Sequence, residues 1–130
     1  MRPRGRLRFG VLLLSAGVAT CGGGSPTPAA PTPPPANPNR LIITAAGVSP
    51  VELVVAPGTR VLFVNNDTRR HDMTSDPHPE HADCPEINQV GLLQPGQSRE
   101  TGNLVAVRTC GYHDHENPDT ANLRGRIVIR

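Results

Sequence analysis

The side chains that could bind a transition metal are concentrated in one part of the chain. All five histidines and two of the three cysteines lie between residues 71 and 115: His71, His78, His81, Cys84, Cys110, His113 and His115. Imidazole and thiolate groups bind copper, zinc or iron in preference to calcium or magnesium. The pattern predicts a metal-binding protein. It shows no nucleophile with a base at a readable spacing, so we do not expect an enzyme.

Short apolar runs rich in β-branched residues must position these ligands. Runs of strand length occupy residues 41–43, 51–56, 60–65, 103–107 and 126–129. Pro-Gly turns at 56–59 and 94–97 bound several of them. No segment keeps a helical period. These features are typical of an all-β sandwich or barrel, here with a core of Val, Leu and Ile around Phe63 and Tyr112.

Residues 66–90 differ from the rest of the domain. This stretch carries many charged side chains, and Pro77, Pro79 and Pro85 oppose regular strand pairing. A loop of this length in a compact domain is usually functional or disordered. Because prolines stiffen it, we expect a functional loop.

The first 20 residues have the composition of an export signal. Four arginines precede an apolar stretch at 9–19, which is shorter than the roughly 20 residues that span a bilayer. Cys21 follows directly in Val18-Ala19-Thr20-Cys21. This resembles the lipoprotein box of bacterial proteins, although Thr20 stands where Gly, Ala or Ser is usual. The resemblance implies diacylation of Cys21 and a membrane-anchored protein on the periplasmic or extracellular side of the cell envelope. Simple secretion is the alternative.

Residues 21–39 are predicted to be a disordered linker. They are rich in Pro, Gly, Ser and Thr and cannot bury apolar surface. Residues 40–130 remain for one small domain. This domain has nine Arg, no Lys and eleven acidic residues, so its charge is about −2. That balance does not indicate nucleic-acid binding, and we expect a monomer.

Four segments of the domain resemble those of cupredoxins, in the same order. They are residues 61–67 followed by His71, the Pro-Gly hairpin at 93–98, Cys110-x-x-His113, and the closing run 123–129. The resemblance covers most of residues 41–130. It implies a cupredoxin-like Greek-key β-sandwich with a blue, type 1 copper site and a function in electron transfer.

The resemblance also implies which residues bind copper. A type 1 site uses two imidazoles and one thiolate with a weak axial contact. His71 would come from an early strand, the Cys110 thiolate from the end of a late strand, and His113 from the loop that follows.

The chain departs from the cupredoxin pattern after Cys110. The loop is long, Leu123 stands where the family has its axial Met, and His115 and Glu116 are additional candidate ligands. Either His113 or His115 could be the second imidazole. Such a site would be more open and less blue, similar to the red copper of nitrosocyanin-type cupredoxins.

The two domain cysteines have a second interpretation. In an oxidising compartment, Cys84 and Cys110 could form a disulfide worth about 3 kcal/mol. If Cys110 binds copper instead, Cys84 is a second ligand or a free thiol. A binuclear copper site and a structural zinc site that uses both cysteines are further alternatives.

The remaining candidates lie beside these ligands. His78 and His81 are either incidental histidines of a solvated acidic loop or part of a second site that passes copper on. Asp72 and Asp114 each follow a candidate ligand and could fix an imidazole tautomer. Met73 is expected in the core.

Several functions fit this ligand set. We expect a copper-binding electron carrier, with a redox partner or copper donor that the sequence does not name. The alternatives are copper trafficking or buffering, an open copper site that reacts with a small molecule, and a disulfide-stapled sandwich without metal.

Overall fold

The computed structural model describes residues 37–130. The predicted signal segment, the Cys21 anchor and residues 21–36 of the predicted linker lie outside the described residues. None of the helices in the described part is long and apolar enough to cross a membrane.

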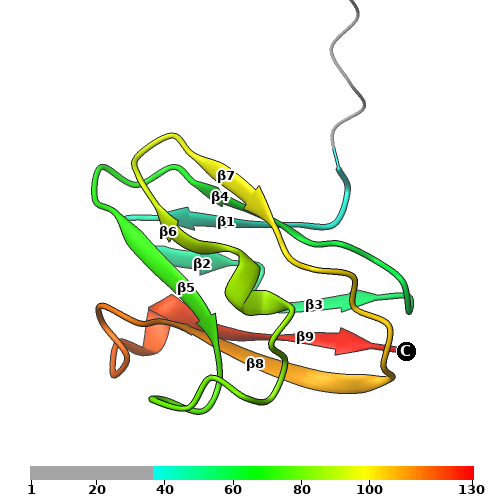
Figure 1. Ribbon diagram of the computed structural model, residues 1–130. Coiled ribbons are helices and arrows are strands. Elements are labelled where there is room, and N and C mark those ends of the chain that lie inside the picture. Colours follow the sequence, from blue (N-terminus) through cyan, green and yellow to red (C-terminus); the bar gives the residue numbers. More distant parts are fainter. Residues whose placement is uncertain (1–36) are drawn as a thin grey trace, which may run out of the picture. The chain divides into compact units, whose positions relative to one another are not determined.

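Within residues 37–130, nine strands form two sheets that face each other as the layers of a sandwich (Figure 1). The four-stranded sheet has the order β2 (Gly47–Ser49), β1 (Arg40–Thr44), β4 (Leu62–Asn65) and β7 (Ser98–Glu100). The five-stranded sheet has the order β3 (Glu52–Val55), β9 (Arg124–Ile129), β8 (Arg108–Asp114), β5 (His71–Ser75) and β6 (Gly91–Leu93). Two short 3-10 helices, η1 (Ile87–Gln89) and η2 (Ala121–Leu123), complete the described part. The predicted all-β sandwich is confirmed.

The core lies between the two sheets and is mainly aliphatic. Leu41 and Ile43 from β1 are fully buried, as are Met73 from β5 and Ile127 from β9. The two aromatic rings of the domain, Phe63 and Tyr112, meet edge to face with centroids 5.3 Å apart. The predicted core positions of these rings and of Met73 are therefore correct.

Strand β8 positions the functional residues, and its alternation decides which of them can meet. Cys110 and Tyr112 belong to the apolar core, so Gly111 and His113 face the opposite side of the sheet. Antiparallel pairing with β5 and β9 fixes this register, with His113 beside Thr74 on one side and Arg124 on the other.

Two predicted segments differ from the structure. Residues 103–107 do not form a strand, and only an isolated bridge joins Leu104 to Thr59. Val105 and Val107 in this segment are exposed, so these β-branched side chains do not pack in the core. The predicted long loop at 66–90 contains β5 and η1. Strand β5 was missed because it carries polar side chains inward, including buried His71 and Ser75.

Candidate metal centre

Cys84 and Cys110 form a disulfide in the interior of the domain. Their Cα atoms are 5.7 Å apart, and both residues are completely buried. Of the two interpretations of these cysteines, the structure has the disulfide. Cys110 in this bonded state has no thiolate to offer copper, and Cys84 is equally unavailable to copper or zinc.

The geometry of β8 explains why Cys110 and His113 do not share a metal. The Cys-x-x-His pattern requires the strand to end at the cysteine, so that the histidine can turn back from a loop. Strand β8 instead continues to Asp114. Residues three apart on a strand project to opposite faces, and Cys110 and His113 therefore lie on different sides of the sheet.

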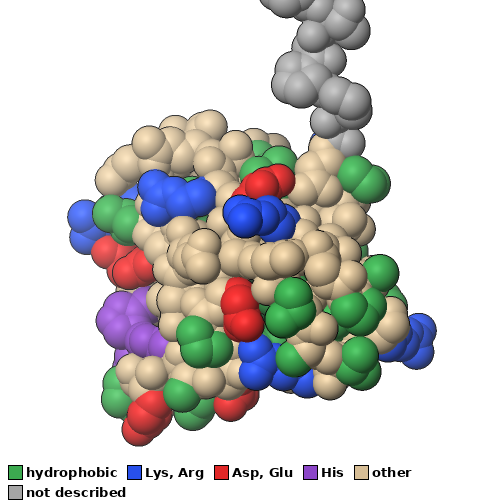
Figure 2. All heavy atoms as spheres, turned by 45° about the vertical axis from the view of Figure 1, so that its right-hand side comes forward, with side chains coloured by type: hydrophobic (Ala, Val, Ile, Leu, Met, Phe, Trp, Pro, Cys, Tyr) green, Lys and Arg blue, Asp and Glu red, His purple; other side chains and the backbone are tan. Residues whose placement is uncertain are grey.

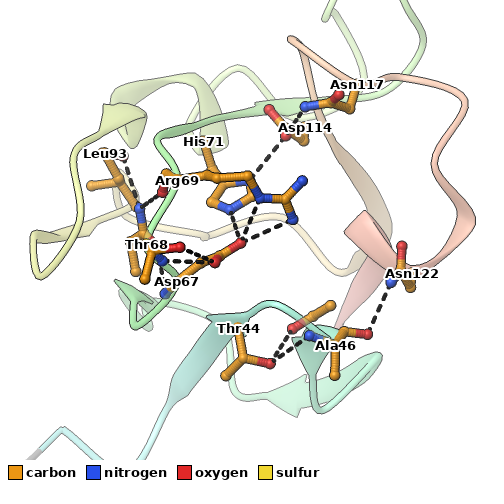
Figure 3. A network of polar contacts seen from close by, with 12 residues as sticks. Thr44, Ala46, Asp67, Thr68, Arg69, His71, Leu93, Asp114, Asn117 and Asn122 are labelled. Carbon is orange, nitrogen blue, oxygen red and sulfur yellow. Dashed lines mark hydrogen bonds and ion pairs between the residues drawn. The ribbon is translucent and has the colours of Figure 1, made fainter.

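His71 does not join the other histidines, which corrects its expected role as a ligand. Its imidazole is buried between two carboxylates (Figure 3). Nδ1 lies 3.0 Å from Oδ2 of Asp114, and Nε2 lies 3.0 Å from Oδ2 of Asp67. Both ring nitrogens are thus already in hydrogen bonds, and neither has a lone pair directed at an open site.

Dense hydrogen bonding keeps both of these carboxylates ionised. Burial by itself would raise the pKa of Asp67, but hydrogen bonds from His71, the Thr68 backbone and Arg69 lower it to about 2. Burial would likewise raise the pKa of Asp114. Hydrogen bonds from the Asn117 side chain, from His71 and from backbone N–H groups outweigh that effect and lower it. This network joins the start of β5 to the end of β8 and stabilises the fold.

The other four histidines form a compact cluster on the opposite face of the five-stranded sheet. His78, His81, His113 and His115 each offer a ring nitrogen, and the four nitrogens lie within 4.8 Å of one another. Ring centroids of neighbouring members are 4.8–5.6 Å apart. Such a set could hold a single metal ion. The cluster brings together two residues expected as ligands and two expected only as a possible second site.

Two separate segments supply these imidazoles. His113 lies on β8, and the backbone N–H of His115, just past the strand end, donates to the Asp72 carbonyl of β5 at 2.7 Å. Because they are two residues apart, both side chains reach the same face. His78 and His81 come from the loop that follows β5. The four ligands therefore come from two segments. One segment lies just before Cys84 and the other just after Cys110, and the disulfide joins these two cysteines.

His113 is the buried member of the cluster, and its ring is held by hydrogen bonding. Nδ1 lies 2.6 Å from Oδ1 of Asp76, while Nε2 has a long contact of 3.5 Å to Oγ1 of Thr74. With Nδ1–H donating to a carboxylate, Nε2 carries the lone pair of the neutral ring.

His81 is held in an uncommon backbone conformation. Its φ is +53°, in the left-handed region, which is sparsely populated by residues other than Gly, Asn, Asp and His. Its N–H donates to the Pro77 carbonyl at 2.7 Å, and its carbonyl accepts from Nδ2 of Asn88 at 2.9 Å. These contacts turn the side chain toward the cluster, where Nε2 lies 3.1 Å from Nδ1 of His115.

The environment of His81 favours its neutral form. Burial lowers the pKa of its imidazole below 6.5, and the neighbouring rings of His115, His113 and His78 lower it further. Asp72 has a smaller, opposing effect. A neutral imidazole is the form that binds metal.

Acidic side chains lie near the cluster, and Glu116, another expected ligand, is engaged elsewhere. In Figure 2 the imidazoles form one patch at the edge of the molecule, with acidic groups above and below it. Glu116 pairs with Arg70 at 2.7 Å. Leu123, at the place of the family's axial Met, is buried in the core. A solvent-open hollow beside His78 and His113 is lined further by Asp119 and Arg124.

Several solved structures have a similar arrangement of strands. A purple cupredoxin from Nitrosopumilus maritimus superposes with a TM-score of 0.55 at 20% identity, covering 70% of this chain and 98% of that chain. The oxidised plastocyanin of the fern Dryopteris crassirhizoma gives a TM-score of 0.54 at 17% identity, over 70% and 99%. This chain has the cupredoxin fold.

A fold of this kind also forms one part of a larger enzyme of known structure. A copper-containing nitrite reductase from Thermus scotoductus matches with a TM-score of 0.58 at 20% identity, over 72% of this chain and 22% of that chain. No protein-family model matches the sequence, and no curated protein matches it. At these identities the likeness to solved cupredoxins establishes the fold alone.

One functional residue was missed by sequence reasoning. Asp72 and Asp114 were expected to bond a ligand imidazole, because each follows a candidate histidine. Asp114 does bond an imidazole, that of His71, but the carboxylate on His113 is that of Asp76. Asp76 is 37 residues from His113 in sequence, and only the pairing of β5 with β8 brings them together.

Proposed function

We propose that this protein binds one copper ion through His78, His81, His113 and His115 and holds it for exchange with another protein. The observation that carries the proposal is the convergence of four imidazole nitrogens within 4.8 Å of one another. The donor set fits copper, because imidazole is a good ligand for copper and Cu(II) binds such sites more tightly than other divalent first-row metals. One solved neighbour with this fold is, by its title, a copper-containing nitrite reductase. Zinc is the competing ion.

The donor set favours holding and passing on copper over a blue-copper role. Type 1 sites need a thiolate, and the disulfide removes the one that Cys110 would supply. Of the four imidazoles, those of His78 and His115 are exposed, so a partner can reach them. Asp76 and Asp119 line the hollow beside His78 and His113 and can attract a cation.

Electron transfer is the second candidate function. Its support is the fixed position of the ligand segments, because β8 is paired on both sides and the loop of His78 and His81 ends at the disulfide. A ligand frame that changes little between oxidation states lowers the cost of moving an electron. The two roles are distinguished by reversible voltammetry of the copper-loaded protein against copper loss to a competing chelator.

The proposed setting is the cell envelope, outside the cytoplasm. The supporting observations are the disulfide, which forms and persists in oxidising compartments, and the export-like N-terminal sequence. A lipid anchor at Cys21 would keep the domain at a membrane.

The test uses the full chain with Cys21→Ser, which leaves no free thiol when Cys84 and Cys110 are bonded. Cu(I) added without oxygen keeps the protein diamagnetic, so nitrogen NMR can follow each imidazole. We expect one equivalent to shift four of the five histidines and to leave His71 unchanged, which makes His71 an internal control. Cu(II) should give an EPR spectrum of nitrogen ligation and no intense thiolate-to-copper band in the visible absorption spectrum.

Two variants and one competitor sharpen the result. His81→Asn and His113→Ala should each weaken copper binding at least tenfold, whereas Asp119→Asn, in the hollow beside the cluster, should weaken it far less. Tighter binding of zinc than of copper would reassign the metal. Copper binding that neither histidine variant changes would overturn the proposed site.

A further inference from the structure

Asp76 occupies a notch on the outer face of β8. Any side chain at position 111 would overlap the carboxylate of Asp76, because its Cβ would collide with Oδ2. Gly111 therefore leaves the space that the carboxylate fills. The backbone of Asp76 is fixed on the same strand, since its N–H donates to the Gly111 carbonyl at 3.0 Å.

Further hydrogen bonds fix the other side of this residue. The Asp76 carbonyl accepts from the Asp83 N–H at 2.9 Å and from Oγ of Ser75 at 3.0 Å. Asp76 is thus tied both to β8 and to the far end of the loop that carries His78 and His81. Its position does not depend on a bound ion.

The carboxylate makes one short polar contact inside the cluster. Oδ1 lies 2.6 Å from Nδ1 of His113, a ring that is almost completely buried. The Arg124 guanidinium lies 3.8 Å from the same oxygen, at the outer rim of the hollow. A hydrogen bond to an ionised carboxylate is short and strong, so it can set the orientation of the ring.

We propose that Asp76 is the positioning residue of the metal site, and that Gly111 is the residue that admits it. The carboxylate holds the His113 proton on Nδ1 and leaves Nε2 as the metal-binding atom. Partners of this kind orient a ligand imidazole and raise its basicity. The inference rests on the proposed function, because it assigns a role toward the same ion.

His113 needs such a partner more than the other three ligands do. Its ring is 1% exposed, so it has little access to water that could replace a lost hydrogen bond. The exposed rings of His78 and His115 can exchange tautomers in contact with solvent. Loss of the Asp76 contact should therefore act on the one ligand that cannot adjust.

The experiment uses the Cys21→Ser chain with three substitutions. Asp76→Ala removes the acceptor, Asp76→Asn keeps an oxygen in place without the charge, and Gly111→Ala displaces the carboxylate without changing any polar group. Asp119→Asn is the matched control, since it removes one negative charge from the same hollow. Chemical denaturation confirms that each variant is folded.

Two readouts separate positioning from a merely structural role. Nitrogen NMR of the metal-free protein reports the His113 tautomer, which we expect on Nδ1–H in wild type and Asp76→Asn and redistributed in Asp76→Ala. Copper affinity should fall about 10–100-fold in Asp76→Ala and Gly111→Ala, less in Asp76→Asn, and little in Asp119→Asn.

The outcomes distinguish this inference from the proposed function. If wild type binds copper and Asp76→Ala binds it equally well with an unchanged His113 tautomer, the positioning role is overturned and the copper site stands. If wild type binds no copper, the proposed function fails first and the inference fails with it.

Discussion

Cys110 and His113 lie on one strand, three residues apart, and face opposite sides of the sheet. Cys110 is bonded to Cys84 in the core, and His113 joins the cluster on the outer face. The partner cysteine, Cys84, is also three residues from a histidine of the cluster, His81. The disulfide therefore ties together, from inside the domain, the two segments that carry the ligands outside it.

Removing the disulfide should weaken both stability and metal binding. The double substitution Cys84→Ala and Cys110→Ala opens a link between residues 26 apart in sequence, which should cost about 3–4 kcal/mol of unfolding free energy. Copper affinity should fall as well, because the loop of His78 and His81 loses its attachment. Urea denaturation and copper titration measure the two effects. Cys21→Ser is the control and should change neither; a double variant as stable as wild type would contradict the prediction.

Acid should destabilise the domain through the carboxylates around His71. The pKa of Asp67 is lowered from 3.8 to about 2 in the folded protein, and that of Asp114 is also lowered. A folded-state pKa below the unfolded one contributes stability above pH about 4, and this contribution is lost as the pH falls toward 2. Denaturation curves between pH 6 and 2 should show this decline. Asp67→Asn should flatten it, and an equally steep decline in that variant would assign the effect to other groups.

The metal-free cluster should be sensitive to mild acid. The pKa of His81 is lowered below 6.5, mainly by burial and then by the adjacent imidazoles. Its neutral form therefore stabilises the fold above pH 6.5, and that contribution is lost as the pH falls through the lowered pKa. We expect copper affinity to fall over the same range, because protons and metal compete for the rings. His81→Asn is a suitable variant, since Asn tolerates the left-handed backbone. It should reduce the pH dependence of unfolding between pH 7 and 5, and an unchanged dependence would argue against His81 as its source.

Tyr112→Phe should preserve or increase stability. The Tyr112 hydroxyl is buried and finds no hydrogen-bond partner among residues 37–130, and burial raises its pKa. Leaving a buried polar group unpaired costs about 1–3 kcal/mol, part of which the substitution should recover. Thermal and urea unfolding test this, with Tyr112→Ala as the comparison. The alanine variant loses the edge-to-face contact with Phe63 and should cost about 3–5 kcal/mol. A clear loss of stability in Tyr112→Phe would show that the hydroxyl has a partner after all.

The fold was predictable from the sequence because several of its strands have a clear strand composition. Strands β1, β3, β4 and β9 are rich in aliphatic and β-branched residues, and the Pro-Gly turn at 56–59 separates β3 from β4. Strand β7 is fully exposed and has only three residues, so no hydrophobic pattern marks it. Val105 and Val107 led to the opposite error, a strand predicted at 103–107 that does not form. Strand propensity without burial does not produce a strand.

The site was predictable as a region but not as a set of ligands. The concentration of histidines between residues 71 and 115 located it. Assigning Cys110 to the metal assumed that β8 ends there, but the strand continues to Asp114. His71 was assigned without its two carboxylate partners, Asp67 and Asp114. The role of Asp76 depends on strand register, which the residue types around it do not encode.

The disulfide has a consequence for the order of events in the life of this protein. An ion held by His78, His81, His113 and His115 would join the same two segments that Cys84 and Cys110 already join. The ion and the disulfide would then cross-link the same two segments, the ion reversibly and the disulfide permanently. A newly made chain that takes up copper before oxidation would have its cysteines brought into register by the metal, and a mature chain that gives its copper away would keep the empty site assembled for the next ion.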